Sequence, residues 1–432
     1  MAAFSFATHK TLAMIANMSE QDPKERDHKK LGPELELFYI DQEIGKGLPM
    51  FLPKGAVIKR ELERFVIEEE TKRGYMHVHT PDIAKLSLYE KSGHYPHYQD
   101  SMYAPIEIDD EKFMLRPMTC PHHFQLFLSR PRSYRELPMR IAELAQLYRY
   151  EQSGELMGLQ RVRTFCLADA HIICASEEQA AEEISAALDL IEYMASVFGL
   201  TLDTHYRYRL SLGDRTNTEK YYKNDAAWEK SEGLLRSLME KRGCKFEEAK
   251  DEAAFYGPKI DIQMKNVNGK EDTAFTVQYD FCMPDRFDLS YMAQDGQKKR
   301  AFVVHRSSIG AIERSMAFLI EHYGGAFPVW LSPVQVKILP VSEKQALYAR
   351  KVYETIRDAG VRVEIDGSND TLGKRVRSAK TEKVPYMIVV GDEEISNETV
   401  AVESRDKGKL GAMSVQDILT RIQAEIKDRK DA

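Results

Sequence analysis

The chain of 432 residues lacks any apolar run that approaches the roughly 20 residues needed to cross a bilayer. Its first residues also lack a basic segment followed by a compact apolar one, which argues against a secretory signal, while an organelle-targeting leader stays open. Only five cysteines occur and none forms a CxxC pair, which favours a reducing compartment over a disulfide framework. These absences favour a cytoplasmic protein in a reducing compartment.

The familiar phosphate-binding loops are absent as well. The sequence contains neither G-x-x-x-x-G-K-[ST] nor G-x-G-x-x-G between a strand and a helix. A nucleotide site would therefore have to use side chains on a sheet. An excess of basic residues is also missing, because 61 Lys and Arg stand against 68 Asp and Glu, a net charge of −7. Any nucleic acid would have to bind through a local basic patch.

What is present predicts two folded domains after a polar leader at 1–32. Apolar periodicity predicts helices at 54–74, with Ile58, Leu62, Phe65 and Val66 as the buried stripe, at 176–199 and at 309–325. Strands are expected at 75–81, 111–117, 135–174, 254–266, 272–283 and 299–307. Strands that follow one another without regular helical crossovers indicate an α+β domain with a large antiparallel sheet.

The rhythm changes after the Gly/Pro/Trp-rich segment 325–333, which we interpret as a linker. Beyond it, strands and helices alternate, ending in a helix that begins near Ser414. This alternation predicts a separate small α/β domain of about 100 residues.

The segment 148–174 concentrates charged side chains in a predicted hairpin. Arg149 and Glu151 repeat with period 2 on one strand, and Arg161 and Arg163 do so on the returning strand. Guanidinium groups bind phosphates, and a nearby carboxylate can hold the accompanying Mg²⁺. An ion-paired, solvated hairpin explains the residues equally well. Arg314, at the start of a helix, would by itself be expected in solvent.

Three further residues form a candidate metal-ligand set. Cys120 is expected at a strand-to-helix junction, and His171 and His305 follow apolar strand residues. Three protein ligands with an open fourth position are typical of a catalytic zinc site. Their spacing is no metal motif, and a hydrogen-bonded core histidine explains either His alone. The remaining loop or cap histidines are expected at the surface: His94, His97, His122 and His123.

The order of these features resembles the three signature motifs of class II aminoacyl-tRNA synthetases. Within that class the chain resembles the threonyl-tRNA synthetases from RDHKKLG onward, through the words KSGHYPHY, LRPMTCPHH, YRYEQSG, GLQRVR, DAHIIC, AFYGPK, TVQYDF, HRSSIGAIER and VPYMIVVGDEE. The resemblance implies a class II catalytic domain at 33–328 and an anticodon-binding domain at 333–432. It also implies a threonine–tRNA ligase, which forms threonyl-adenylate with ATP and Mg²⁺ and transfers threonine to tRNA-Thr.

The resemblance further implies roles for individual residues. The ATP-binding residues would be Arg149, Glu151, Arg161, Phe165, Thr276 and Arg314, with Lys259 near the reacting carboxylate. Asp169, Tyr256 and Gln278 would form the amino-acid pocket. One Zn²⁺, held by Cys120, His171 and His305, would select threonine over valine.

The resemblance implies a homodimer through the 54–73 helix and the strand after it. Anticodon contacts would come from Asn369 and Glu394, but Glu403 stands where the family has an arginine, which Arg405 could replace. Ala311 stands where a small hydroxyl residue is common. Family members usually carry ubiquitin-like and editing domains before the matching region, so proofreading in cis is not expected here.

Two rival interpretations stay open. A paralogue could bind tRNA or mRNA as a regulator, but the intact ATP and zinc residues weigh against it. An enzyme that activates an amino acid and loads a carrier would not need the anticodon-type domain.

Overall fold

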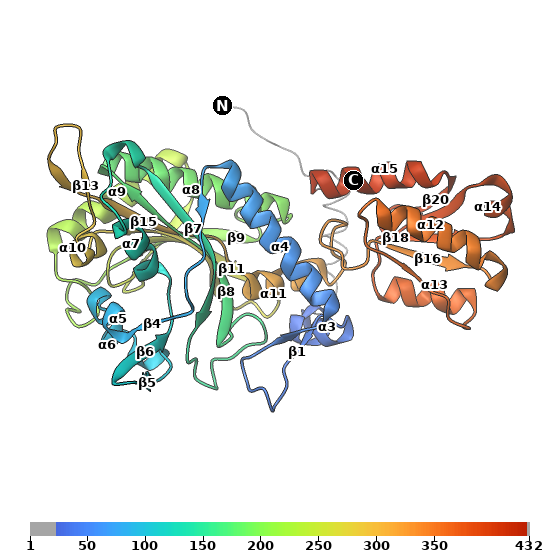
Figure 1. Ribbon diagram of the computed structural model, residues 1–432, viewed down its shortest axis with the longest axis horizontal. Helices are drawn as coiled ribbons and strands as arrows, with labels where there is room; N and C mark the ends of the chain where they lie inside the picture. The colour runs from blue at the N-terminus through green and yellow to red at the C-terminus, as the bar shows by residue number, and fades with distance from the viewer. Residues whose placement is uncertain (1–22, 430–432) are drawn as a thin grey trace. The chain divides into compact units, whose positions relative to one another are not determined.

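The computed structural model describes residues 23–429, and the chain groups into two compact units (Figure 1). The larger unit comprises Ile40–Pro49 and Glu63–Ala317. Among the described residues, the smaller unit comprises 23–39, Met50–Leu62 and 318–429. Both units carry helices packed on a mixed sheet, so the predicted fold class is confirmed. The predicted domain boundaries stay a prediction.

The larger unit is organised around an eight-stranded sheet with strand order β10-β9-β11-β12-β15-β8-β7-β3. The five central pairings, from β9 to β7, are antiparallel, as expected, and the outermost pairings β10–β9 and β3–β7 are parallel. The strands are β3 (Met76–His77), β7 (Met139–Tyr148), β8 (Thr164–Cys174), β9 (Tyr206–Leu212), β10 (Phe246–Lys250), β11 (Lys259–Lys265), β12 (Glu271–Asp280) and β15 (Phe302–Ala311).

Two long helices form at the positions that the apolar periodicity of the sequence predicts. Helix α8 (Glu177–Val197) packs against β8, β12 and β15, and the Ser176 side chain caps it by accepting from the Gln179 amide. Helix α4 (Pro53–Lys72) buries its predicted apolar stripe completely, and Gly74 follows it with a positive φ of 79°. Helices α4 and α11 (Ile312–Tyr323) are each divided between the two units, with half of their residues in the larger one. The other helices of the larger unit are α5 (Leu86–Ser92), α6 (His94–His97), η1 (Gln99–Ser101), α7 (Cys120–Leu128), η2 (Tyr134–Glu136), α9 (Asp225–Arg242) and α10 (Met283–Phe287).

Two parts of the larger unit differ from expectation. The hairpin strands stop at Tyr148 and resume at Thr164, so residues 149–163 form a loop rather than strand ends. This stretch is polar and glycine-containing, and Gly158 adopts a positive φ of 50°, which a strand does not allow. The elements β9, α9 and β10 were not predicted. Small sheets β4-β6-β5 and β13-β14 complete the unit, with strands β4 (Ile83–Lys85), β5 (Ile106–Ile108), β6 (Glu111–Leu115), β13 (Ser290–Met292) and β14 (Lys298–Arg300).

The smaller unit contains the predicted α/β arrangement. Its five-stranded sheet has the order β17-β16-β18-β19-β20 and packs against amphipathic helices, which bury Val352, Ile356, Ile418 and Ile422. Strand β20 and helix α14 were not predicted. The elements are β16 (Val336–Pro340), η3 (Glu343–Gln345), α12 (Ala346–Asp358), β17 (Val363–Ile365), α13 (Leu372–Thr381), β18 (Tyr386–Val390), α14 (Asp392–Asn397), β19 (Val400–Ser404), β20 (Gly408–Met413) and α15 (Val415–Asp428).

The described part of the predicted polar leader, residues 23–32, is mostly helical. Residues 1–22 lie outside the described part of the chain, but helices α2 (Pro23–Arg26) and α3 (His28–Glu34) follow. His28 is buried, and its Nδ1 lies 2.6 Å from Oε1 of Glu321. The hairpin β1 (Phe38–Tyr39) and β2 (Met50–Phe51) belongs to the same unit.

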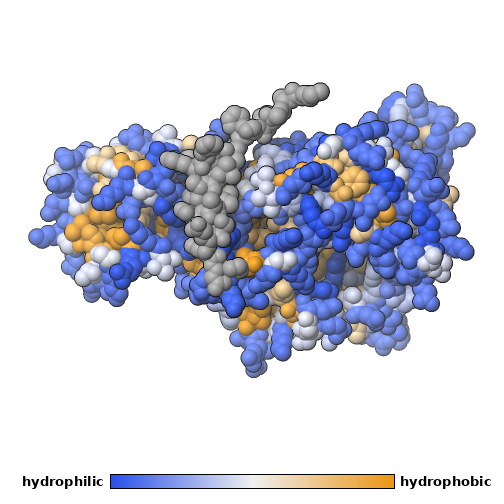
Figure 2. Space-filling view, turned by 180° about the vertical axis from the view of Figure 1, so that it is seen from behind, coloured by the Kyte–Doolittle hydropathy of each residue, from blue (hydrophilic) through white to orange (hydrophobic). Residues whose placement is uncertain are grey.

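The surface carries scattered apolar side chains. Figure 2 shows a mostly hydrophilic face with separate hydrophobic patches. Within residues 23–429, no helix combines the length and apolar character that a membrane span requires.

Candidate active site

Strand pairing places the predicted site residues of β8, β12 and β15 on one face of the central sheet. Gln278 lies opposite His305, and His305 opposite His171, so their side chains share a face. Two residues along, Thr276, Ser307 and Asp169 form a second row on the same face, because strand side chains repeat with period 2. Residues far apart in sequence therefore meet through register alone.

A cavity of about 480 Å³ lies over this face, a size typical of small-molecule sites. All predicted metal, ATP and amino-acid residues line it: Cys120, Arg149, Glu151, Arg161, Phe165, Asp169, His171, Tyr256, Lys259, Thr276, Gln278, His305 and Arg314. Ala311 lines it as well. The structure thus brings together every residue predicted for these three roles.

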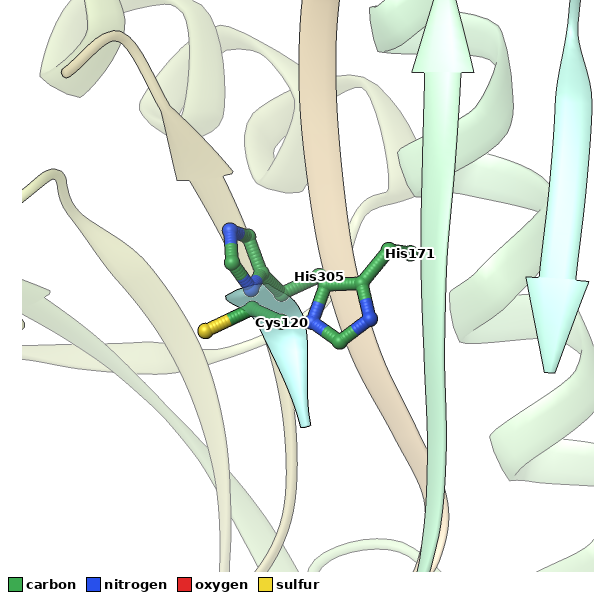
Figure 3. Close-up of side chains that lie close together, drawn as sticks. All are labelled: Cys120, His171 and His305. Carbon is green, nitrogen blue, oxygen red and sulfur yellow. The ribbon is translucent and has the colours of Figure 1, made fainter. Parts of the chain in front are cut away.

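Cys120, His171 and His305 lie close together (Figure 3), and all three line the cavity. One donor atom from each lies within 4.8 Å of the other two, and all three side chains are buried. Cys120 begins helix α7, as expected for a strand-to-helix junction. Burial, together with the nearby carboxylates of Asp169 and Asp280, raises the pKa of the Cys120 thiol. A thiolate at this position therefore requires a cation close to it.

Each histidine of this cluster has one ring nitrogen already engaged. His305 Nε2 lies 2.7 Å from Oδ2 of Asp280, which is fully buried and also accepts from the amides of Cys282 and Met283. His171 Nδ1 lies 2.8 Å from Nδ1 of His123. Burial and the neighbouring histidines lower the pKa of His171, which keeps its ring neutral. Each ring therefore has one nitrogen left for a metal.

The expectation of surface histidines is wrong for three of the four. His94, His122 and His123 are buried, and only His97 is half-buried. Burial lowers the pKa of His94 to about 3, and its Nε2 lies 4.0 Å from the Cys120 sulfur. Short polar words such as GHYPHY and PHH contain no periodicity that signals burial, so the sequence gives no indication of these positions.

The predicted phosphate-binding cations also line the cavity, and neighbouring groups hold them. Arg149 donates to the Pro117 carbonyl at 3.2 Å and lies over the Phe165 ring at 5.2 Å. Arg161 donates to the Glu151 carboxylate at 2.8 Å. The sequence supported a phosphate site and an ion-paired hairpin equally; the structure shows an ion pair between Arg161 and Glu151, and both residues line the cavity.

Arg314 is half-buried rather than solvated. Its Nε donates to the Gln160 carbonyl at 3.0 Å and its Nη1 to the Thr273 carbonyl at 2.6 Å. Burial lowers the pKa of its guanidinium. Lys259 pairs with Asp261 at 2.9 Å, and Asp261 also accepts from the Thr276 hydroxyl at 3.0 Å. These contacts orient cationic groups towards one enclosed space.

The predicted amino-acid pocket lies beside the Cys-His-His cluster. The Tyr256 hydroxyl donates to Oε1 of Gln278 at 2.5 Å, and the Tyr256 ring stacks on His305 with centroids 4.9 Å apart. Asp169 lies 4.0 Å from Nε2 of His171. Burial raises the pKa of Asp169, against the opposing effect of nearby histidines. A ligand ammonium group would stabilise its ionised form.

The residues predicted for the anticodon lie in the smaller unit. Asn369 is exposed before helix α13, and the Glu394 carboxylate accepts from the Gly391 amide at 2.8 Å. Glu403 pairs with Lys380 at 2.8 Å. Arg405 donates to the Phe327 and Lys383 carbonyls and to the Asp406 carboxylate, so its guanidinium is engaged by neighbours in the same unit.

Comparison with known proteins finds two matching families, one for each predicted domain. Residues 103–323 match the tRNA synthetase class II core domain (G, H, P, S and T), and residues 335–425 match the anticodon binding domain. Two similar curated relatives are threonine–tRNA ligases. The one from Geobacillus sp. is 47% identical over 94% of this chain, and the one from Clostridium perfringens is 48% identical over 95%. This chain spans 63% and 64% of their lengths.

A solved structure agrees. The RNA binding domain of threonyl-tRNA synthetase from Cryptosporidium parvum superposes with a TM-score of 0.86 at 33% identity, covering 92% of this chain and 98% of that one. The matched core domain contains all the predicted metal, ATP and amino-acid residues, and the matched anticodon binding domain contains the five-stranded sheet. The chain therefore belongs to the threonyl-tRNA synthetase family of class II aminoacyl-tRNA synthetases.

Proposed function

We propose that this chain is a threonine–tRNA ligase that activates L-threonine with ATP and transfers it to tRNA-Thr. One observation carries the proposal: a buried Cys-His-His cluster and four guanidinium groups, those of Arg149, Arg161, Arg306 and Arg314, line a single cavity. Such a cavity can hold a small amine at one end and a triphosphate at the other. Substrates and partners named for the relatives extend to this chain as part of the proposal.

The chemistry suits residues that position and neutralise charge. A threonine carboxylate oxygen attacks the α-phosphorus of ATP, a new P–O bond forms, and the bond to the bridging oxygen breaks as pyrophosphate leaves. The attacking carboxylate is already ionised, so no general base is required, and the barrier falls through alignment and electrostatic stabilisation. Arg149 and Arg314 would hold the phosphates of Mg²⁺-ATP, with Arg161 and Glu151 exchanging their mutual ion pair for contacts with the nucleotide.

Phe165 and Thr276 would contact the nucleotide, and Lys259 would lie near the reacting carboxylate. Asp169, Tyr256 and Gln278 would bind the threonine amino group and exclude larger side chains. Their existing contacts support this assignment, because Tyr256 bridges Gln278 and the His305 ring. A rigid pocket of this kind loses little entropy when the substrate binds.

Zinc fits the Cys-His-His cluster. Bonds of about 2.3 Å to sulfur and about 2.0 Å to nitrogen place tetrahedral ligands about 3.5 Å apart, which is compatible with donors that lie within 4.8 Å of one another. Each histidine has one free nitrogen, and the Cys120 thiolate needs a cation. When bound, zinc would supply Lewis-acid coordination to the substrate amine and hydroxyl, which valine cannot satisfy fully.

Discrimination by apolar contacts alone would be weak. Valine is nearly isosteric with threonine, and such pockets separate a methyl from a hydroxyl by only about 100-fold. A site that must engage the hydroxyl separates them by about 10⁴-fold or more. Serine keeps the hydroxyl and lacks only a methyl group, worth about 1–3 kcal/mol, so it should be rejected poorly.

The function is tested by amino-acid-dependent ATP–pyrophosphate exchange. We expect exchange with threonine, weaker exchange with serine, and almost none with valine. The same preparation should then charge tRNA-Thr, and charging of transcripts with altered anticodon bases measures the effect of Glu403. A zinc-replete protein without threonine-dependent exchange would contradict the proposal. Exchange without charging would instead favour the carrier-loading alternative.

We also infer that the chain forms a homodimer. Strand β3 lies at the edge of the eight-stranded sheet, where unpaired backbone groups invite pairing with another chain. Met76 on this strand is 49% exposed and Ile67 on α4 is 40% exposed. Sedimentation velocity should give twice the chain mass of 49.6 kDa, and Met76→Lys should weaken association. A single-chain mass throughout the micromolar range would rule the dimer out.

A further inference from the structure

A buried histidine that the proposed chemistry does not use lies directly behind the candidate metal site. His123 is fully buried on helix α7, the helix that begins with Cys120. Its Nδ1 faces His171 Nδ1 at 2.8 Å, and its Nε2 faces Glu143 Oε2 at 3.1 Å. His123 thus bridges a candidate zinc ligand and a carboxylate.

Glu143 is anchored by other donors. It is 1% exposed on strand β7, and its Oε1 accepts from the Thr80 amide at 3.0 Å and from Arg116 Nη1 at 3.1 Å. Its Oε2 accepts from the Thr80 hydroxyl at 2.8 Å as well as facing His123. Burial opposes its charge, but these hydrogen bonds and Arg116 lower the pKa of Glu143 to about 2. Glu143 therefore acts only as an acceptor.

This arrangement specifies where the ring protons lie. Because Oε2 of Glu143 accepts, His123 carries its proton on Nε2, and its neutral ring then offers Nδ1 as an acceptor. His171 must then donate from Nδ1, which leaves a lone pair on its Nε2.

We propose that Glu143 and His123 are positioning residues that set the tautomer of His171, so that Nε2 of His171 is presented to the metal as a lone pair. The inference rests on the proposed zinc site. The other histidine ligand, His305, has the simpler form of the same device, a direct bond to Asp280. Outer partners of this kind orient a ligand ring and raise its basicity.

The isosteric variant Glu143→Gln tests the proposal. Arg116 and the Thr80 amide are donors, so the Gln oxygen should face them and the Gln NH₂ should face His123. His123 would then accept at Nε2 and donate from Nδ1, which drives the His171 proton onto its metal-facing nitrogen. We expect the zinc affinity of the full chain, measured by competition with a chromogenic chelator, to fall about 10–100-fold.

Glu183→Gln is the matched control. Glu183 is a buried carboxylate paired with Arg140 at 2.6 and 2.7 Å, and it bonds to neither the metal-ligand set nor His123. It therefore experiences the same change of charge without the relay. We expect this variant to bind zinc as the parent does, with circular dichroism and melting temperature reporting on the fold of both.

A second pair of variants keeps the test decisive if Glu143→Gln is unstable. His123→Asn places an oxygen near the position of Nδ1, so it can still accept from His171, whereas His123→Leu cannot. We expect Asn to retain most of the zinc affinity and Leu to lose it. Glu143→Gln should then have little further effect in the Asn background, a coupling that a merely structural role would not produce.

The outcomes separate the relay from the zinc site itself. A parent chain that binds zinc while Glu143→Gln and His123→Leu bind it equally well overturns the relay and leaves the proposed function standing. The same loss in Glu183→Gln also overturns it. A parent that binds no zinc removes the metal from the proposed function, and the relay with it.

Discussion

Cys120→Ser is expected to abolish tight zinc binding and, with it, threonine-dependent exchange. Serine replaces a thiolate by an alcohol that stays protonated, so only two protein ligands would remain. Loss of an outer partner of a metal ligand costs about 10–100-fold in metal affinity, so loss of the ligand itself should cost more than about 100-fold. The measurement is zinc content after dialysis against a chelator, together with exchange in the presence of threonine.

The control is Cys174→Ser. Cys174 is a fully buried cysteine on strand β8, three residues beyond His171, and its thiol donates to the Ile172 carbonyl at 3.9 Å. This variant tests whether any buried Cys→Ser change disturbs the sheet. It should retain zinc and exchange. A Cys120→Ser protein that still holds one zinc per chain would show that the cluster is not the metal site.

Arg149→Ala should reduce exchange by about 100–1,000-fold, the usual cost of removing one preorganised group that stabilises developing charge. Arg149 is held at the cavity wall by the Pro117 carbonyl and the Phe165 ring, so little reorganisation is needed when the phosphates arrive. We expect the larger share of the loss in kcat. Exchange rates at varied ATP and threonine concentrations separate this from a simple loss of binding.

Arg163→Ala is the matched comparison for Arg149. Arg163 belongs to the same hairpin and is also stacked on a ring, that of Tyr150 at 5.0 Å. Its guanidinium donates to the Glu151 and Lys46 carbonyls and does not line the cavity. It should retain most of the exchange activity. Equal losses in the two variants would mean that the hairpin only needs its cations for folding.

Local sequence pattern was enough to predict several of the longer helices. The stripe of Ile58, Leu62, Phe65 and Val66 could be identified from a 3.6-residue period, and all four are buried. Ser176 was identified as a cap from its residue type and position. Such features depend on neighbours within one or two helical turns, so they can be predicted without information about the rest of the chain.

The segment 148–174 shows what local sequence pattern cannot predict. Its two strands pair as expected, but the charged residues 149–163 leave the sheet. Period-2 alternation cannot distinguish a strand end from a loop, because both tolerate alternating charges. Whether Arg161 and Glu151 formed a surface ion pair or a cavity wall depended on residues from other segments, such as Arg314.

The sequence by itself therefore determined the change from consecutive strands to alternating strands and helices, the residues that could bind a metal or phosphate, and the family resemblance. Only the tertiary structure decided that His123 lies behind His171, that Asp280 supports His305, and that Cys120 joins both histidines at 4.8 Å or less. The physical reason is that cross-strand register and helix docking bring together residues separated by up to 185 positions. The free energy that favours one strand register over another depends on packing across the whole sheet, so it cannot be derived from a short segment of sequence.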